Sequence, residues 1–196
     1  MCIDERGPLS ARTHQGQDLV AVHPGDGRPA GRARQEVDDG RCASEGYVFG
    51  ALPPVTGEVL IATHPARTIS SDVAFLDQVE AWVPAAVERV SAVRDNLTVH
   101  TADDVLLFSV AHPRGESVFQ SHDAASLNLI EPWWKTLKSL ALKGRRFEMW
   151  AEVEAAVHAA TAYWNAHRHP FVRGRRRRHR MPRALGIANL PRIALL

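Results

Sequence analysis

Three carboxylates stand where secondary-structure elements are predicted to end or begin. Asp4 closes a short apolar run, Asp95 directly follows a predicted strand, and Glu131 lies in the first turn of a predicted helix. Carboxylate oxygens are the ligands that Mg²⁺ prefers, and two such ions ~3.5–4 Å apart can hold the attacking and leaving oxygens of a phosphodiester. If the three elements meet at one end of a sheet, these acids predict metal-dependent phosphoryl transfer.

Each acid also has a simpler interpretation. Asp4 could be a solvated residue at the chain terminus, and Asp95 could belong to a turn with Asn96. Glu131 could be part of a local helix start, with Asn128 as its cap and Pro132 tolerated in the opening turn. Residue type and spacing leave both interpretations open at all three positions.

The elements that must position these acids alternate between strands and helices. The first strand ends at Asp4 and looks cut short, because a central strand normally has about five or six residues. A long Gly- and Pro-rich loop is expected over 24–46, after a poorly defined strand near 18–22. This order predicts an α/β fold, a mixed sheet flanked by helices, which is compatible with an RNase H-like domain. The remaining predicted strands are 47–52, 58–63, 89–94 and 117–120, and the predicted helices are 72–83, 101–110, 128–143 and 147–167.

The charge of the 196-residue chain is unevenly distributed. The net charge is only +2, yet no acidic residue follows Glu154. We therefore expect one domain over 1–172 and a basic tail over 173–196. The tail could be simply solvated, or it could contact DNA phosphates. Its candidate DNA-binding residues are Arg173, Arg175, Arg176, Arg177, Arg178 and Arg180.

Composition argues against several other classes of protein. No uncharged apolar run approaches the ~18 residues of a membrane span, and the first residues do not form a signal segment. Cys2 and Cys42 give neither a disulfide framework nor a zinc site with nearby histidines. These features favour a cytoplasmic protein.

The sequence segments around the three acids resemble those of IS630-type transposases, which belong to the DDE superfamily. Residues 2–9 (CIDERGPL) are similar to the first catalytic segment of that family, and residues 92–100 (AVRDNLTVH) to the second. Residues 126–137 (SLNLIEPWWKTL) look like the third segment, which is the most specific. The stretches 144–147 (GRRF) and 163–171 (YWNAHRHPF) are similar to the closing helices of the family.

This resemblance implies an RNase H-like catalytic domain in which Asp4, Asp95 and Glu131 bind Mg²⁺ or Mn²⁺. It implies nicking at transposon ends, followed by attack of a 3′-hydroxyl on target DNA. Double-stranded DNA would be the partner, a homodimer is an assembly to consider, and the nucleoid would be the place of action. Asn96 and His100 would contact DNA or support the metal ligands.

The sequence also departs from the family pattern. Family members usually carry helix-turn-helix modules before the catalytic domain, so we expect a copy truncated at its N-terminus. Arg94 stands where the family has an apolar residue, and an unpaired buried Arg would be costly. Gly115, Asp123 and Arg173 replace aromatic residues. The alternatives are therefore an inactive DNA-binding remnant or a structure-specific nuclease on the same fold.

Overall fold

The computed structural model describes residues 1–16, 44–119 and 128–170. Most of the loop expected over 24–46, the strand expected near 18–22 and the basic tail over 173–196 lie outside these residues.

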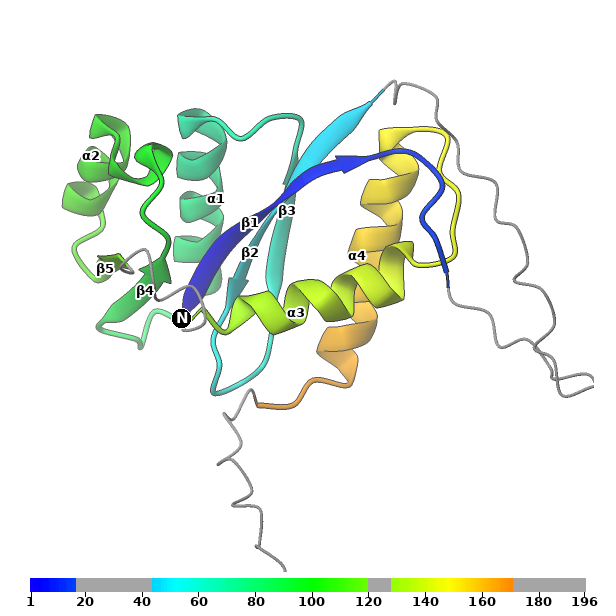
Figure 1. Ribbon diagram of the computed structural model, residues 1–196. Coiled ribbons are helices and arrows are strands. Elements are labelled where there is room, and N and C mark those ends of the chain that lie inside the picture. The colour runs from blue at the N-terminus through cyan, green and yellow to red at the C-terminus, as the bar shows by residue number, and fades with distance from the viewer. Residues whose placement is uncertain (17–43, 120–127, 171–196) are drawn as a thin grey trace, which may run out of the picture.

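A five-stranded mixed sheet forms the centre of the molecule, as the sequence predicted. Its order is β3-β2-β1-β4-β5, with β1, β2 and β3 antiparallel and β4 and β5 parallel to β1 (Figure 1). The loop over 53–57 joins β2 to β3 as a hairpin connection. The strands are β1 (Cys2–Ser10), β2 (Glu45–Leu52), β3 (Leu60–His64), β4 (Val90–Arg94) and β5 (Gly115–Phe119).

The first strand does not end at Asp4, so that prediction is wrong. β1 has nine residues and pairs with β2 from Cys2 to Ser10. The ladder to β2 satisfies the backbone even where the sequence turns polar and exposed, which is why the apolar pattern missed the continuation. Only on its other side is the pairing short, with Cys2 opposite Val93 and the Val93 N–H donating to the Met1 carbonyl at 2.8 Å.

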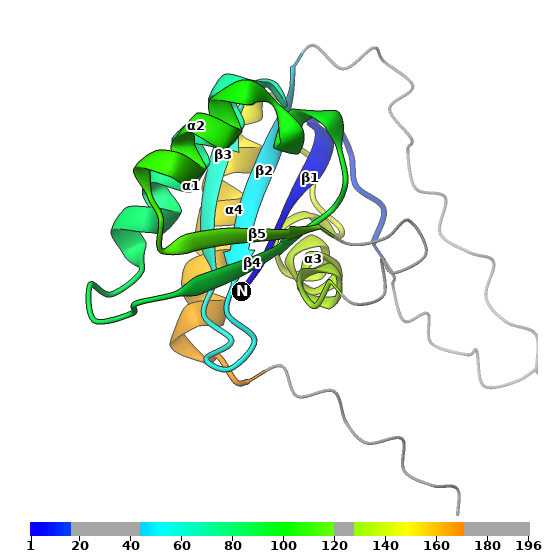
Figure 2. The ribbon, with the colours of Figure 1, turned by 90° about the vertical axis from the view of Figure 1, so that its left-hand side faces the viewer.

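Helices cover both faces of the sheet. α1 and α2 lie on one face, and α3 and α4 lie on the other (Figures 1 and 2). In the described residues, no helix combines the length and the apolar character that a membrane crossing needs. The helices are α1 (Ile69–Trp82), α2 (Asp103–Ala111) after the 3₁₀ turn η1 (Thr98–Thr101), α3 (Ile130–Leu137) with the π-helical turn η3 (Lys138–Leu142), and α4 (Trp150–Ala166).

Two helix starts differ from the sequence-based expectation. α1 begins at Ile69 and not at 72, after Thr68, whose hydroxyl accepts the Ser71 N–H at 3.1 Å as the helix cap. α2 begins at Asp103 and not at 101, after Ala102 and without a side-chain cap. Both boundaries move by only a few residues, and neither change affects the layers.

Alternation along β1 sends neighbouring side chains to opposite layers. Cys2 packs in the core under α3 and α4, whereas Ile3 packs in the core under α1 and α2. Because successive residues of a strand face opposite sides, Asp4 faces the α3 layer and Glu5 faces the α1 layer. The contacts of both side chains, described below, agree with this assignment.

Gly50 of β2 provides the surface on which α3 rests. It pairs with Asp4 of β1. A Cβ at Gly50 would lie 2.7 Å from the Trp134 ring and 3.0 Å from the Ile130 side chain. Only a residue without a side chain therefore lets α3 come this close to the sheet beside Asp4.

We expect Gly50→Ala to lower the free energy of unfolding by about 1–3 kcal/mol, because the added methyl overpacks the α3 contact. Urea denaturation measures this loss. Gly115→Ala is the matched control, since a Cβ at Gly115 meets its nearest neighbour, the His112 carbonyl oxygen, at an ordinary 3.5 Å. Equal effects of the two changes would contradict the close contact.

Candidate active site

Asp4 and Asp95 come from neighbouring parallel strands. Cys2 of β1 pairs with Val93 of β4; Asp4 lies two residues further along β1, and Asp95 follows the last residue of β4. Asp4 faces the α3 layer, whereas the Asp95 carboxylate contacts the buried His100 ring at 2.9 Å. The two acids therefore belong to neighbouring strands, and their side chains have different partners.

α3 supplies the third acid. Glu131 is exposed in its first turn, and Trp134, one turn further on, donates its indole N–H to Asp4 Oδ2 at 2.8 Å. Asn128 Oδ1 accepts the Ile130 N–H at 3.4 Å, but the cap residue of α3 is Leu129 and not Asn128 as the sequence suggested. The helix start and the proximity of Glu131 to Asp4 are compatible, because both follow from where α3 begins.

The environment of Asp4 is unfavourable for its own negative charge. Burial raises the Asp4 pKa to about 6; the Trp134 hydrogen bond lowers it, and the charges of Glu5 and Glu131 raise it further. The charge effect of Glu131 shows that the two carboxylates are close enough to repel each other. The site therefore has an excess of negative potential that a cation would relieve.

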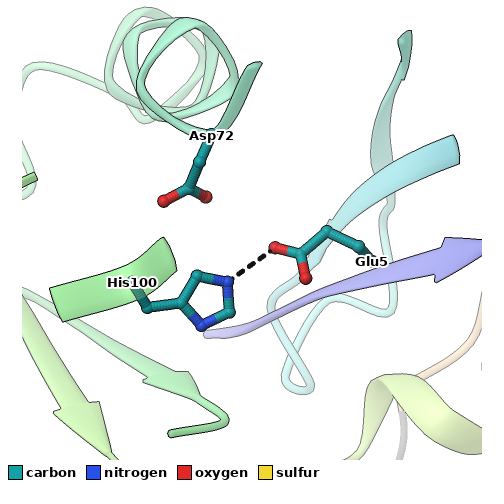
Figure 3. A group of neighbouring side chains, drawn as sticks. All are labelled: Glu5, Asp72 and His100. Atoms are coloured by element: carbon teal, nitrogen blue, oxygen red, sulfur yellow. Dashed lines mark hydrogen bonds and ion pairs between the residues drawn. The ribbon is translucent and has the colours of Figure 1, made fainter. Parts of the chain in front are cut away.

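A second, buried group of charges lies behind this site, in the α1 layer. Figure 3 shows that Glu5, Asp72 and His100 converge from β1, α1 and η1. One potential ligand atom from each lies within 4.8 Å of the others. We call these three residues together with Arg94 the buried charge cluster.

Arg94 neutralises Asp72 within this cluster. The Arg94 Nη2 pairs with Asp72 Oδ1, and both side chains are fully buried. Arg94 is therefore buried, and its charge is compensated because α1 places an acid against it. Burial raises the Asp72 pKa, and the Arg94 guanidinium opposes that shift. With Arg94 and His100 supplying positive charge, the cluster is balanced without a metal ion.

His100 connects the buried charge cluster to Asp95. Its Nε2 lies 2.9 Å from Glu5 Oε1. Its Nδ1 hydrogen-bonds the Asp95 carbonyl oxygen at 3.1 Å and makes an ion-pair contact with Asp95 Oδ1 at 2.9 Å, without hydrogen-bond geometry to that oxygen. Burial lowers the His100 pKa, but the hydrogen bond and charge of Glu5 outweigh it, so the pKa is raised overall. The protonated ring can then contact both acids.

The structure thus joins Asp4 to the helix that carries Glu131 and holds Asp95 against His100, and the metal-binding role of the three acids stays a prediction. Asn96 is exposed next to Asp95. The arginines proposed for DNA binding, from Arg173 to Arg180, lie outside the described residues. Sequence reasoning missed Glu5 and Asp72 as partners of the site; the position of Glu5 beside Asp4 was the only available signal.

No protein-family model matches the sequence, and no curated protein matches it. Solved structures of Mos1 transposase are similar in fold. The Mos1 mariner paired end complex with Mn has a TM-score of 0.59 at 15% identity, and the paired-end complex with the left transposon end has 0.57 at 12%; each match covers 87% of this chain and 48% of that chain. The Mos1 Strand Transfer Complex has 0.53 at 14% identity, covering 83% and 51%.

These matches establish the fold. The mixed five-stranded sheet with flanking helices is the RNase H-like arrangement. This chain spans about half the length of the Mos1 chains that it resembles.

We expect Asp72→Ala to lower the free energy of unfolding by about 3–5 kcal/mol, because it leaves the Arg94 guanidinium buried without its partner. The double change Asp72→Ala/Arg94→Met should lose clearly less, since no uncompensated charge remains. Urea denaturation measures the free energy of unfolding of both variants, and their difference shows how much of the loss comes from the uncompensated charge of Arg94. Glu116→Ala, which breaks the exposed pair with Arg89, is the control and should lose less than about 1 kcal/mol.

Asp4 should make metal-free protein less stable as the pH rises. Its pKa of about 6 in the folded chain exceeds the ordinary 3.8, so the folded state holds the Asp4 proton more tightly than the unfolded state does. Between about pH 4.5 and about pH 7.5 this costs wild type about 1–2 kcal/mol. Asp4→Asn keeps an acceptor for Trp134 and should gain that amount over wild type across this range. The free energy of unfolding of both proteins is measured by chemical denaturation at each pH. A difference between them that does not change with pH would refute the shifted pKa.

Proposed function

We propose that this chain is the catalytic domain of a DDE-type DNA transposase related to the IS630 type. In this proposal Asp4, Asp95 and Glu131 hold Mg²⁺ or Mn²⁺, and the domain cleaves DNA at transposon ends and joins it to target DNA. The observation that most supports the proposal is the Trp134–Asp4 hydrogen bond, which joins Asp4 of an RNase H-like sheet to the helix that carries Glu131.

The chemistry of the three side chains suits divalent cations. All offer carboxylate oxygens, the donors that Mg²⁺ and Mn²⁺ accept. The Asp95 side chain is 43% exposed and Glu131 is exposed, so both can reach a bound ion, while the raised pKa of Asp4 marks unneutralised negative potential. Bound metal ions would activate a water or a 3′-hydroxyl and stabilise the charge that develops on the phosphate.

The surrounding residues fix the ligands in place. The Trp134 N–H orients Asp4, and His100 holds Asp95 from the buried side through its backbone and its carboxylate. Side chains that are restrained before the reaction keep the donor oxygens in position. Asn96 and the arginines from Arg173 to Arg180 are proposed to contact the DNA.

The pairing of Arg94 bears on whether the copy is active. An unpaired buried Arg would be costly, and the ion pair with Asp72 compensates the charge of Arg94, although its Nε and Nη1 have no hydrogen-bond partner among the described residues. β1 likewise carries Asp4 within a nine-residue strand that pairs with β2 on both sides of an irregularity between Arg6 and Leu9. Both observations favour an intact catalytic domain over an inactive remnant. Double-stranded DNA at transposon ends and targets is the proposed partner, acted on in the nucleoid by a homodimer.

Nicking of supercoiled plasmid DNA by the purified chain tests the proposal. Wild type should nick in Mg²⁺ or Mn²⁺ and not in EDTA. Asp95→Asn and Glu131→Gln should each reduce the nicking rate at least about 100-fold, because each removes a charged metal ligand. Both variants should still bind DNA.

Asp77→Asn, which changes an exposed acid of α1, is the matched control and should nick like wild type. Metal-dependent nicking that survives both Asp95→Asn and Glu131→Gln would overturn the assignment of the acids. DNA binding by wild type without any metal-dependent cleavage would instead identify a non-catalytic DNA-binding protein.

A further inference from the structure

A groove lined with basic residues opens beside the candidate active site. It has a volume of about 300 Å³ and lies between the second half of β1, the segment that follows it, and the α3–η3 helix. We call it the basic groove. Its cationic and titratable lining residues are Arg6, Arg12, His14 and Lys138.

The basic groove lies next to Asp4, on the other side of Trp134. Trp134 lines the groove and also donates to Asp4 Oδ2 at 2.8 Å, so one side chain forms the boundary between the two. Arg6 follows Asp4 by two residues in β1 and therefore points to the same face of the sheet. A DNA strand that runs from the three acids toward Arg6 would therefore enter the groove.

The cations of the groove are not neutralised by described acids. Among the described residues, the ion pairs involve other arginines, such as Arg114 with Glu80 and Arg146 with Glu148, and do not include Arg6, Arg12 or Lys138. Three unpaired cations around one depression create a positive potential that attracts polyanions.

The pKa of His14 reflects the positive charges around it. Its pKa is lowered by burial and, in addition, by the charges of Arg12 and Lys138, although a hydrogen bond with the Ser10 carbonyl opposes the shift. Arg12 and Lys138 come from different elements, the segment after β1 and the turn η3, and both act on the same ring. Two exposed cations from different elements therefore lie close enough to His14 to act on the same ring.

Backbone hydrogen bonds join the segment after β1, which lines the groove, to the segment that follows η3. The His14 N–H donates to the Arg145 carbonyl at 2.8 Å, and the Gly144 N–H donates back to the His14 carbonyl at 3.0 Å. The Phe147 N–H donates to the Arg12 carbonyl at 3.3 Å. These bonds tie the backbone of Arg12 and His14 to the segment 144–147, so exposed Arg145 adds a further cation beside His14.

We infer that the basic groove binds the phosphodiester backbone of the DNA strand whose reacting phosphate lies at Asp4, Asp95 and Glu131. The inference rests on the proposed function and adds a substrate path to it. A site rich in carboxylates repels DNA, and Arg6, Arg12 and Lys138 offset that repulsion on one side. Arg and Lys contacts to phosphates position DNA without reading its sequence, so the groove accepts any sequence.

The test is DNA binding by the full chain in EDTA, where no cleavage occurs. Fluorescence anisotropy of a labelled DNA duplex is measured for wild type and for Arg12→Gln/Lys138→Gln over a range of salt concentrations. Each lost phosphate contact lowers the slope of log K against log salt by about 0.9, so the slope should fall by about 2, with at least a 10-fold weaker affinity at low salt. Arg12→Lys/Lys138→Arg should keep the wild-type slope.

The matched control is Arg89→Gln/Arg168→Gln, which removes the same charge from exposed pairs outside the groove. It should keep the slope and the affinity. An unchanged slope for Arg12→Gln/Lys138→Gln, or an equal loss in the control, would overturn the inference. Because the assay contains no metal, a protein that never nicks DNA can still show the groove effect, so failure of the proposed function is seen separately.

Discussion

The burial of two carboxylates behind the sheet end is the constraint on which the candidate site depends. Glu5 and Asp72 lie on the helix-covered side of β1 and need positive partners there. His100 and Arg94 supply them, one from η1 and the other from the last position of β4. Because His100 also contacts Asp95, the same charge balance that stabilises the interior holds one of the candidate metal ligands.

The neighbouring acids Asp4 and Glu5 face opposite layers of the molecule. Asp4 faces α3, where the charges of Glu5 and Glu131 raise its pKa further, whereas Glu5 faces α1 and pairs with His100 in the buried charge cluster. Only the alternation of a strand lets adjacent acids have such different surroundings. The absence of a side chain at Gly50 then allows α3 to approach, so that Trp134 reaches Asp4 and opens the basic groove on its other side.

Local patterns predicted most of the architecture. The strands around 47–52, 58–63 and 89–94 and the four main helices were expected from apolar periodicity and turn residues, and all are present with shifted ends. The continuation of β1 beyond Asp4 was missed because this segment is polar and has no apolar alternation. It forms a strand through its pairing with β2. The cap at Thr68 was missed because three neighbouring hydroxyl residues are equally good candidates by type.

The sequence by itself determined which acids to consider, the alternation of elements and the concentration of arginines near the C-terminus. Only the tertiary structure decided that Arg94 is paired, that His100 joins Glu5 to Asp95, and that Arg6, Arg12 and Lys138 share one groove. The physical reason is the range of the interactions. Periodicity and capping act within a few residues, whereas charge pairing in the interior depends on strand order and helix docking, which bring together residues that the sequence separates by tens of positions.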